Sequence, residues 1–117
     1  GPVAVRFLGL YDAVDRTPTG WNGRIPANVR AVCHARRDPL AGSRDGLFDN
    51  FGNTGTVYAP NVRYRQMMCF GTHAAMGGDP WSGDHPHELT RAQDEAAARD
   101  ADAFIRKGAR AVGVRIT

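Results

Sequence analysis

The most informative stretch of the sequence is Met67-Met68-Cys69-Phe70-Gly71-Thr72-His73-Ala74-Ala75-Met76-Gly77-Gly78-Asp79-Pro80-Trp81. An apolar run ends at Gly71, one histidine follows, and small residues continue to a Gly-Gly pair. This order predicts a buried strand, a tight turn that carries His73, and a closely packed segment after the turn. Free imidazole exchanges protons near neutral pH, and backbone on both sides would hold this ring in place. We therefore expect His73 to transfer protons.

A second apolar run ends at a carboxylate. Residues 3–11 are almost continuously apolar, which favours a strand covered on both faces, as in a parallel sheet. Asp12 follows directly. Because sites form at the carboxyl ends of parallel strands, neighbouring strands would place Asp12 and His73 at one edge, where the acid could orient the imidazole as in a catalytic triad. The residues leave a second interpretation open, a turn-capping Asp12 and a structural His73.

The remaining pattern predicts one α/β domain with three or four mostly parallel strands, long loops and one C-terminal helix. We expect a second strand at 28–35, an exposed strand at 56–64 broken by Pro60, and a final edge strand or frayed end at 111–116. Thr90-Arg91-Ala92-Gln93 fits a capping box, so the helix should begin there and end at Gly108 after Lys107. Loops are expected at 15–26, 36–55 and 79–89.

Composition limits the possible functions. The 117 residues suit a single domain, and the net charge of +3 with a pI near 9.3 has no basic cluster in the sequence behind it, so nucleic-acid binding is not favoured. No apolar run approaches the ~20 residues of a transmembrane helix. Cys33 and Cys69 lie in apolar runs and are expected to be buried thiols, with a disulfide between them as the second alternative. Residues 1–2, Gly-Pro, resemble the remnant of a cleaved tag, which leaves 3–117 as the domain.

Two motifs resemble a known family. Phe7-Leu8-Gly9-Leu10-Tyr11-Asp12-Ala13-Val14 is similar to the "FLGxxDTV" strand of bacterial α/β-hydrolases that include phospholipase effectors of the type VI secretion system. Gly71-Thr72-His73-Ala74-Ala75-Met76-Gly77-Gly78 resembles the "GxHxxxGG" segment of the same family. The resemblance implies that Asp12 is the acid and His73 the base of a Ser-Asp-His triad. It also implies a partial α/β-hydrolase-like fold for this chain.

The family's nucleophile lies on a G-x-S-x-G turn that precedes the acid, and this chain has no such motif. Its serines, Ser43 and Ser82, are expected to be turn residues. We therefore expect a C-terminal segment of a lipase or phospholipase, inactive alone, with the serine in sequence before Val3. The resemblance implies a lipid or other ester substrate, no cofactor, and a toxin delivered from the bacterial cytoplasm into a target cell. A cognate immunity protein or a secretion-apparatus protein is an expected partner.

Two alternatives to an ester hydrolase remain open from the sequence. The first is a non-catalytic effector module that binds a partner or inhibitor protein, and the second is a small nuclease that uses His73. Asp79, His85 and His87, with Asp84 and Glu88 nearby, are weak candidates for binding a divalent metal. Met76 and Trp81 flank His73 and are candidates for contacting substrate, whereas Met67 and Met68 are expected in the core.

Overall fold

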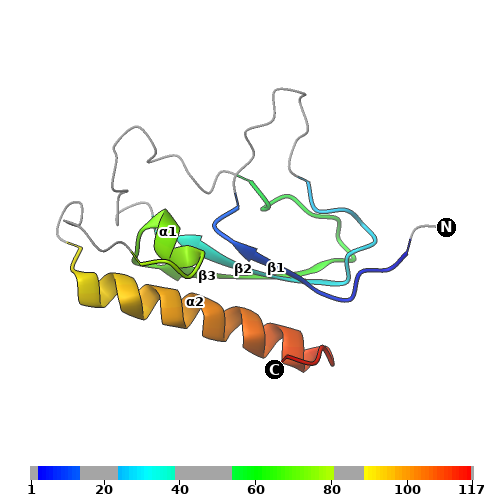
Figure 1. Ribbon diagram of the computed structural model, residues 1–117. Coiled ribbons are helices and arrows are strands. Elements are labelled where there is room, and N and C mark those ends of the chain that lie inside the picture. Colours follow the sequence, from blue (N-terminus) through cyan, green and yellow to red (C-terminus); the bar gives the residue numbers. More distant parts are fainter. Residues whose placement is uncertain (1–2, 14–23, 39–53, 81–88, 117) are drawn as a thin grey trace.

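The computed structural model describes residues 3–13, 24–38, 54–80 and 89–116. The elements in chain order are β1 (Leu8–Tyr11), β2 (Ala31–Arg37), β3 (Arg63–Cys69), α1 (His73–Met76) and α2 (Arg91–Ala111). The strands form one parallel sheet in the order β1-β2-β3, and α2 packs across one of its faces (Figure 1). The expected small α/β arrangement, with a parallel sheet and a C-terminal helix, is therefore present.

Helix α2 runs in the opposite direction to the strands. Near its start, the Cβ of Ala97 would lie 2.6 Å from a Cβ added at Gly71, just after β3. Near its end, a Cβ added at Gly108 would overlap the sulfur of Cys33 in β2. Both glycines therefore permit a close approach of helix and sheet. The first half of α2 consequently lies under the carboxyl ends of the strands, where a site is expected.

The helix begins as predicted but ends later. Thr90 and Gln93 form the expected capping box. Gly108 does not terminate the helix, because it lies on the face that packs against β2. The end is instead formed by Gly113, with φ of 83°, where Gly113 N–H donates to Arg110 and Val114 N–H donates to Ala109. Residues 111–116 are therefore the end of the helix and a tail outside the sheet, so the edge strand, one of the two predicted alternatives, is wrong.

The other strand boundaries also differ from expectation. β1 is shorter than predicted, with Val3 81% exposed. β2 begins three residues later and ends two residues later than predicted. Within the predicted strand at 56–64, residues 56–62 contribute a single bridge, between Ile25 and Tyr58, and regular pairing with β2 starts only at Arg63. Met68 is 45% exposed, so only Met67 of the two methionines packs against the core.

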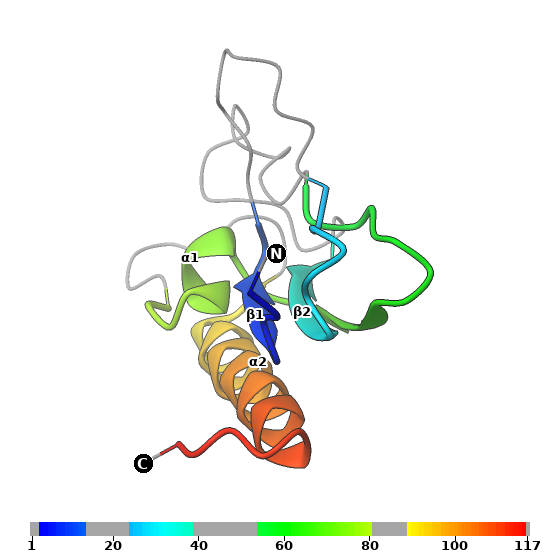
Figure 2. The same ribbon diagram turned by 90° about the vertical axis from the view of Figure 1, so that its right-hand side faces the viewer.

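The core lies on both faces of the sheet. Between the sheet and α2 are the buried residues Cys33, Ala35, Cys69, Ala75, Met76, Ala97, Ala101 and Ile105. The opposite face is covered by the segments before β2 and before β3 (Figure 2), which supply Ile25, Val29 and Val62 around Val32. Both cysteines are buried free thiols, as expected. None of the helices in the described ranges is long and apolar enough to cross a membrane.

Candidate functional site

Asp12 is held rigidly at the end of β1. Its N–H donates to the carbonyl of Ala35 at 2.8 Å, and its Oδ1 accepts a hydrogen bond from the backbone N–H of Arg37 at 3.0 Å. Its φ of 48° lies in the left-handed region, which is uncommon for a residue with a side chain. The residue is only 2% exposed. The end of β2 thus fixes the direction in which this buried carboxylate points.

His73 meets this carboxylate. Nδ1 of His73 lies 2.7 Å from Oδ2 of Asp12, and the imidazole side chain is 31% exposed whereas the carboxylate is 2% exposed. Because an ionised carboxylate can only accept hydrogen bonds, Nδ1 carries the proton and donates it. The second ring nitrogen, Nε2, is directed away from the carboxylate. This is the arrangement that a carboxylate gives to a proton-transferring histidine.

The two residues meet although their strands are not neighbours. β2 lies between β1 and β3, so the adjacent strands assumed in the sequence argument are absent. After β3 the chain instead crosses the carboxyl edge of the sheet, and α1 lies beside the end of β1 (Figure 2). His73 is the first residue of α1, which is why its ring reaches Asp12.

A buried arginine accompanies the pair. Nε of Arg37 lies 3.8 Å from Oδ2 of Asp12, and both side chains are 2% exposed. Opposite charges at this distance attract each other. Arg37 therefore supports Asp12 twice, through its backbone N–H and through its guanidinium group.

Asp94 of α2 fixes the residue before His73. Its Oδ1 accepts from the backbone N–H of Thr72 at 2.6 Å, and its Oδ2 accepts from the Thr72 hydroxyl at 3.0 Å. The same hydroxyl accepts from the N–H of Ala75 and so caps α1. Asp94 was not singled out from the sequence. The sequence does contain a signal for it, since Asp94 has helical spacing with the buried residues Ala97 and Ala101.

His34 fixes the residue after Asp12. This ring, fully buried in β2, accepts at Nε2 from the N–H of Ala13 at 3.2 Å and places Nδ1 3.0 Å from the hydroxyl of Tyr64. The Tyr64 hydroxyl in turn donates to Gln66 at 3.1 Å. Burial, and secondarily the charge of Arg36, lowers the pKa of His34. His34 is therefore a neutral structural histidine. The sequence predicted its place in a strand but not this structural role.

The other predicted site residues do not join this cluster. Met76 is fully buried among the core residues beneath α2, so its side chain lies inside the protein rather than on a groove open to substrate. Asp79 is exposed. Within the described ranges no group of three or more His, Cys, Asp or Glu side chains could hold a metal ion. The remaining candidates lie outside the described residues: Ser43, Trp81, Ser82, Asp84, His85, His87 and Glu88.

No protein-family model, curated protein sequence or solved structure matches this chain.

The role of Asp94 can be tested by Asp94→Asn. The amide offers one acceptor oxygen in place of two, so one Thr72 donor loses its buried partner, at a cost of about 1–3 kcal/mol in the free energy of unfolding. Asp100→Asn is the matched control, because Asp100 is exposed on the same helix and its replacement should change stability by less than about 0.5 kcal/mol. Urea unfolding measures both. Equal stabilities of the two variants would contradict this role.

The neutral state of His34 predicts a pH dependence of stability. Below about pH 6.5 the unfolded chain binds a proton at this ring that the folded protein resists, because burial lowers the pKa of His34 in the folded state. The free energy of unfolding should therefore fall as the pH drops below that value, by at most about 1.4 kcal/mol per pH unit for one proton. His34→Gln should remove this part of the slope in urea unfolding at several pH values. An unchanged slope would rule out a neutral His34.

Proposed function

We propose that Asp12 and His73 are the acid and base of a Ser-Asp-His triad that hydrolyses lipid or phospholipid esters. The observation that carries the proposal is the 2.7 Å contact between Oδ2 of Asp12 and Nδ1 of His73. Buried acid and partly exposed base are the combination that triad chemistry needs, since the carboxylate must stay fixed while the imidazole reaches the reacting groups.

In this mechanism His73 accepts at Nε2 the hydroxyl proton of a serine as the serine oxygen attacks the ester carbonyl. The resulting imidazolium is stabilised by Asp12, which remains ionised. His73 then gives the proton to the departing alcohol oxygen, and a water molecule hydrolyses the acyl-enzyme by the same proton transfers in reverse order. Asp12 thus acts through orientation and charge, and His73 through proton transfer.

The serine is assigned by resemblance to a G-x-S-x-G turn in sequence preceding Val3. The same resemblance supports a bacterial effector that is delivered into a target cell. Ser43 and Ser82 are the serines within the chain itself. Replacing each by alanine distinguishes a nucleophile inside the chain from one that is supplied by preceding sequence.

The test measures ester hydrolysis by the longest natural chain that contains this sequence. Asp12→Asn should lower kcat about 10⁴-fold, because the amide no longer holds the productive tautomer of the histidine, and His73→Gln should lower kcat at least as much. Asp79→Asn, an exposed carboxylate close to α1, is the control and should leave kcat within about twofold. Hydrolysis that survives Asp12→Asn at full rate would overturn the proposed function.

A further inference from the structure

The negative side chains of the described ranges are confined to one part of the molecule, whereas positive side chains also occupy the other end. All carboxylates in the described ranges lie after the strands or in the first twelve residues of α2: Asp12, Asp38, Asp79, Asp94, Glu95, Asp100 and Asp102. The ranges 3–11, 24–37, 54–78 and 103–116 contain no Asp or Glu. Because the strands are parallel and α2 runs against them, the amino ends of the strands and the carboxyl end of α2 share one end of the molecule (Figure 1).

Seven exposed cations gather at that end, which we call the basic end: Arg6, Arg30, Arg63, Arg65, Lys107, Arg110 and Arg115. Within the described part of the chain none of the seven forms a salt bridge. The charge pattern was invisible in the sequence, where these residues are spread over more than one hundred positions. The fold brings them together.

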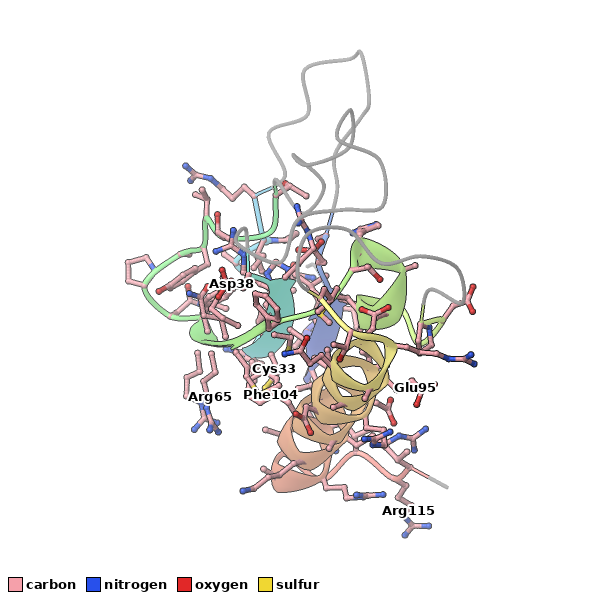
Figure 3. The ribbon with its side chains drawn as sticks, turned by 90° about the vertical axis from the view of Figure 1, so that its left-hand side faces the viewer. Cys33, Asp38, Arg65, Glu95, Phe104 and Arg115 are labelled. Atoms are coloured by element: carbon pink, nitrogen blue, oxygen red, sulfur yellow. The ribbon has the colours of Figure 1, made fainter. Side chains whose placement is uncertain are left out.

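Backbone contacts place three of these cations, Arg6, Arg30 and Arg63, beside one another. The N–H of Arg30 donates to Val5, beside Arg6, and the N–H of Arg63 donates to the carbonyl of Arg30. The Nη1 atom of Arg6 lies 3.6 Å from where a Cβ at Gly113 would be. Figure 3 shows Arg65 and Arg115 projecting outward from β3 and from the tail after α2.

Arg63 and Arg65 also line a cavity of about 150 Å³ between the sheet and the end of α2. Its other walls are mostly apolar: Phe7, Ala31, Val32, Cys33, Gly108, Ala111 and Val112. Guanidinium groups beside apolar walls suit a ligand in which an anionic group adjoins hydrocarbon. Val3 and Val5, which are 81% and 38% exposed, add aliphatic surface at the same end.

We propose that the basic end docks on a lipid bilayer that contains anionic phospholipids. Arginine pairs well with phosphate oxygens, and each basic residue near an anionic bilayer adds to the attraction. Aliphatic side chains next to these cations can enter the interface. Single-stranded nucleic acid would require exposed aromatic rings that are available for stacking. The described aromatic residues among these cations are Phe7 and Tyr64, which are half-buried, and the exposed ring of Tyr58 nearby is already stacked on Tyr64.

This docking surface is separate from the Asp12–His73 site and does not depend on the proposed function. The two lie at opposite ends of the parallel strands. A bound domain would therefore hold His73 on the side away from the bilayer to which it is docked, so this docking does not itself present the lipids of that bilayer to the Asp12–His73 site. Changes at the basic end should leave hydrolysis of a water-soluble ester unchanged, so failure of one proposal is distinguishable from failure of the other.

The test is cosedimentation of the protein with phosphatidylcholine vesicles with and without phosphatidylserine, at an ionic strength of about 0.1 M. We expect binding only to vesicles with phosphatidylserine. Arg63→Gln/Arg65→Gln should weaken partitioning about 25-fold, at about fivefold for each charge. The control, Arg91→Gln/Arg99→Gln, removes the same charge from the first half of α2. It should weaken partitioning onto the vesicles less than about threefold.

Equal losses in the two double variants would overturn the proposal, because they would indicate a response to net charge alone. Equal binding to both kinds of vesicle would also overturn it, and so would binding to a DNA duplex without binding to vesicles. Lys107→Gln/Arg110→Gln provides a second variant from another element if the first is less stable in thermal unfolding. It should give a loss similar to that of the first double variant.

Discussion

The hydrogen bond between Asp12 and His73 is the contact on which the proposed site depends. It joins the end of the first strand to the residue that begins α1, 61 positions later in the chain. Neither residue is held by this contact alone. Arg37 supports the carboxylate from β2, and Asp94 holds Thr72, next to the histidine, from α2. The sheet, the turn before α1 and α2 therefore all hold the Asp12–His73 distance. This explains how a small domain can fix the positions of two side chains.

Close packing of α2 is the second constraint. At Gly71 and Gly108 there is no room for a side chain between helix and sheet. Alanines of α2 such as Ala97 and Ala101 are buried in the same contact. The short separation is what allows the Asp94 carboxylate to reach the backbone of Thr72. The packing of the core and the geometry of the site are thus aspects of a single arrangement, because a shift of α2 would also move the turn that carries His73.

Much of the fold could be predicted from local patterns. The apolar runs before Asp12 and Gly71 indicated strands, and the capping box located the start of α2. The predicted end of α2 was wrong because Gly108, a glycine required for packing, has the sequence pattern of a helix C-terminus. Asp94 and the basic end were missed for a different reason, since each acquires its role from residues distant in the chain. Sequence patterns locate elements well, but they do not show which charges the folded chain brings together.

The most direct test of the account is nitrogen-detected NMR of the His73 ring in the wild-type protein and in Asp12→Asn. The account predicts that the neutral ring carries its proton on Nδ1, that this proton resonates far downfield, and that Asp12→Asn abolishes the signal. A ring that carries its proton on Nε2 in the wild-type protein, with a spectrum unchanged by Asp12→Asn, would contradict the central contact.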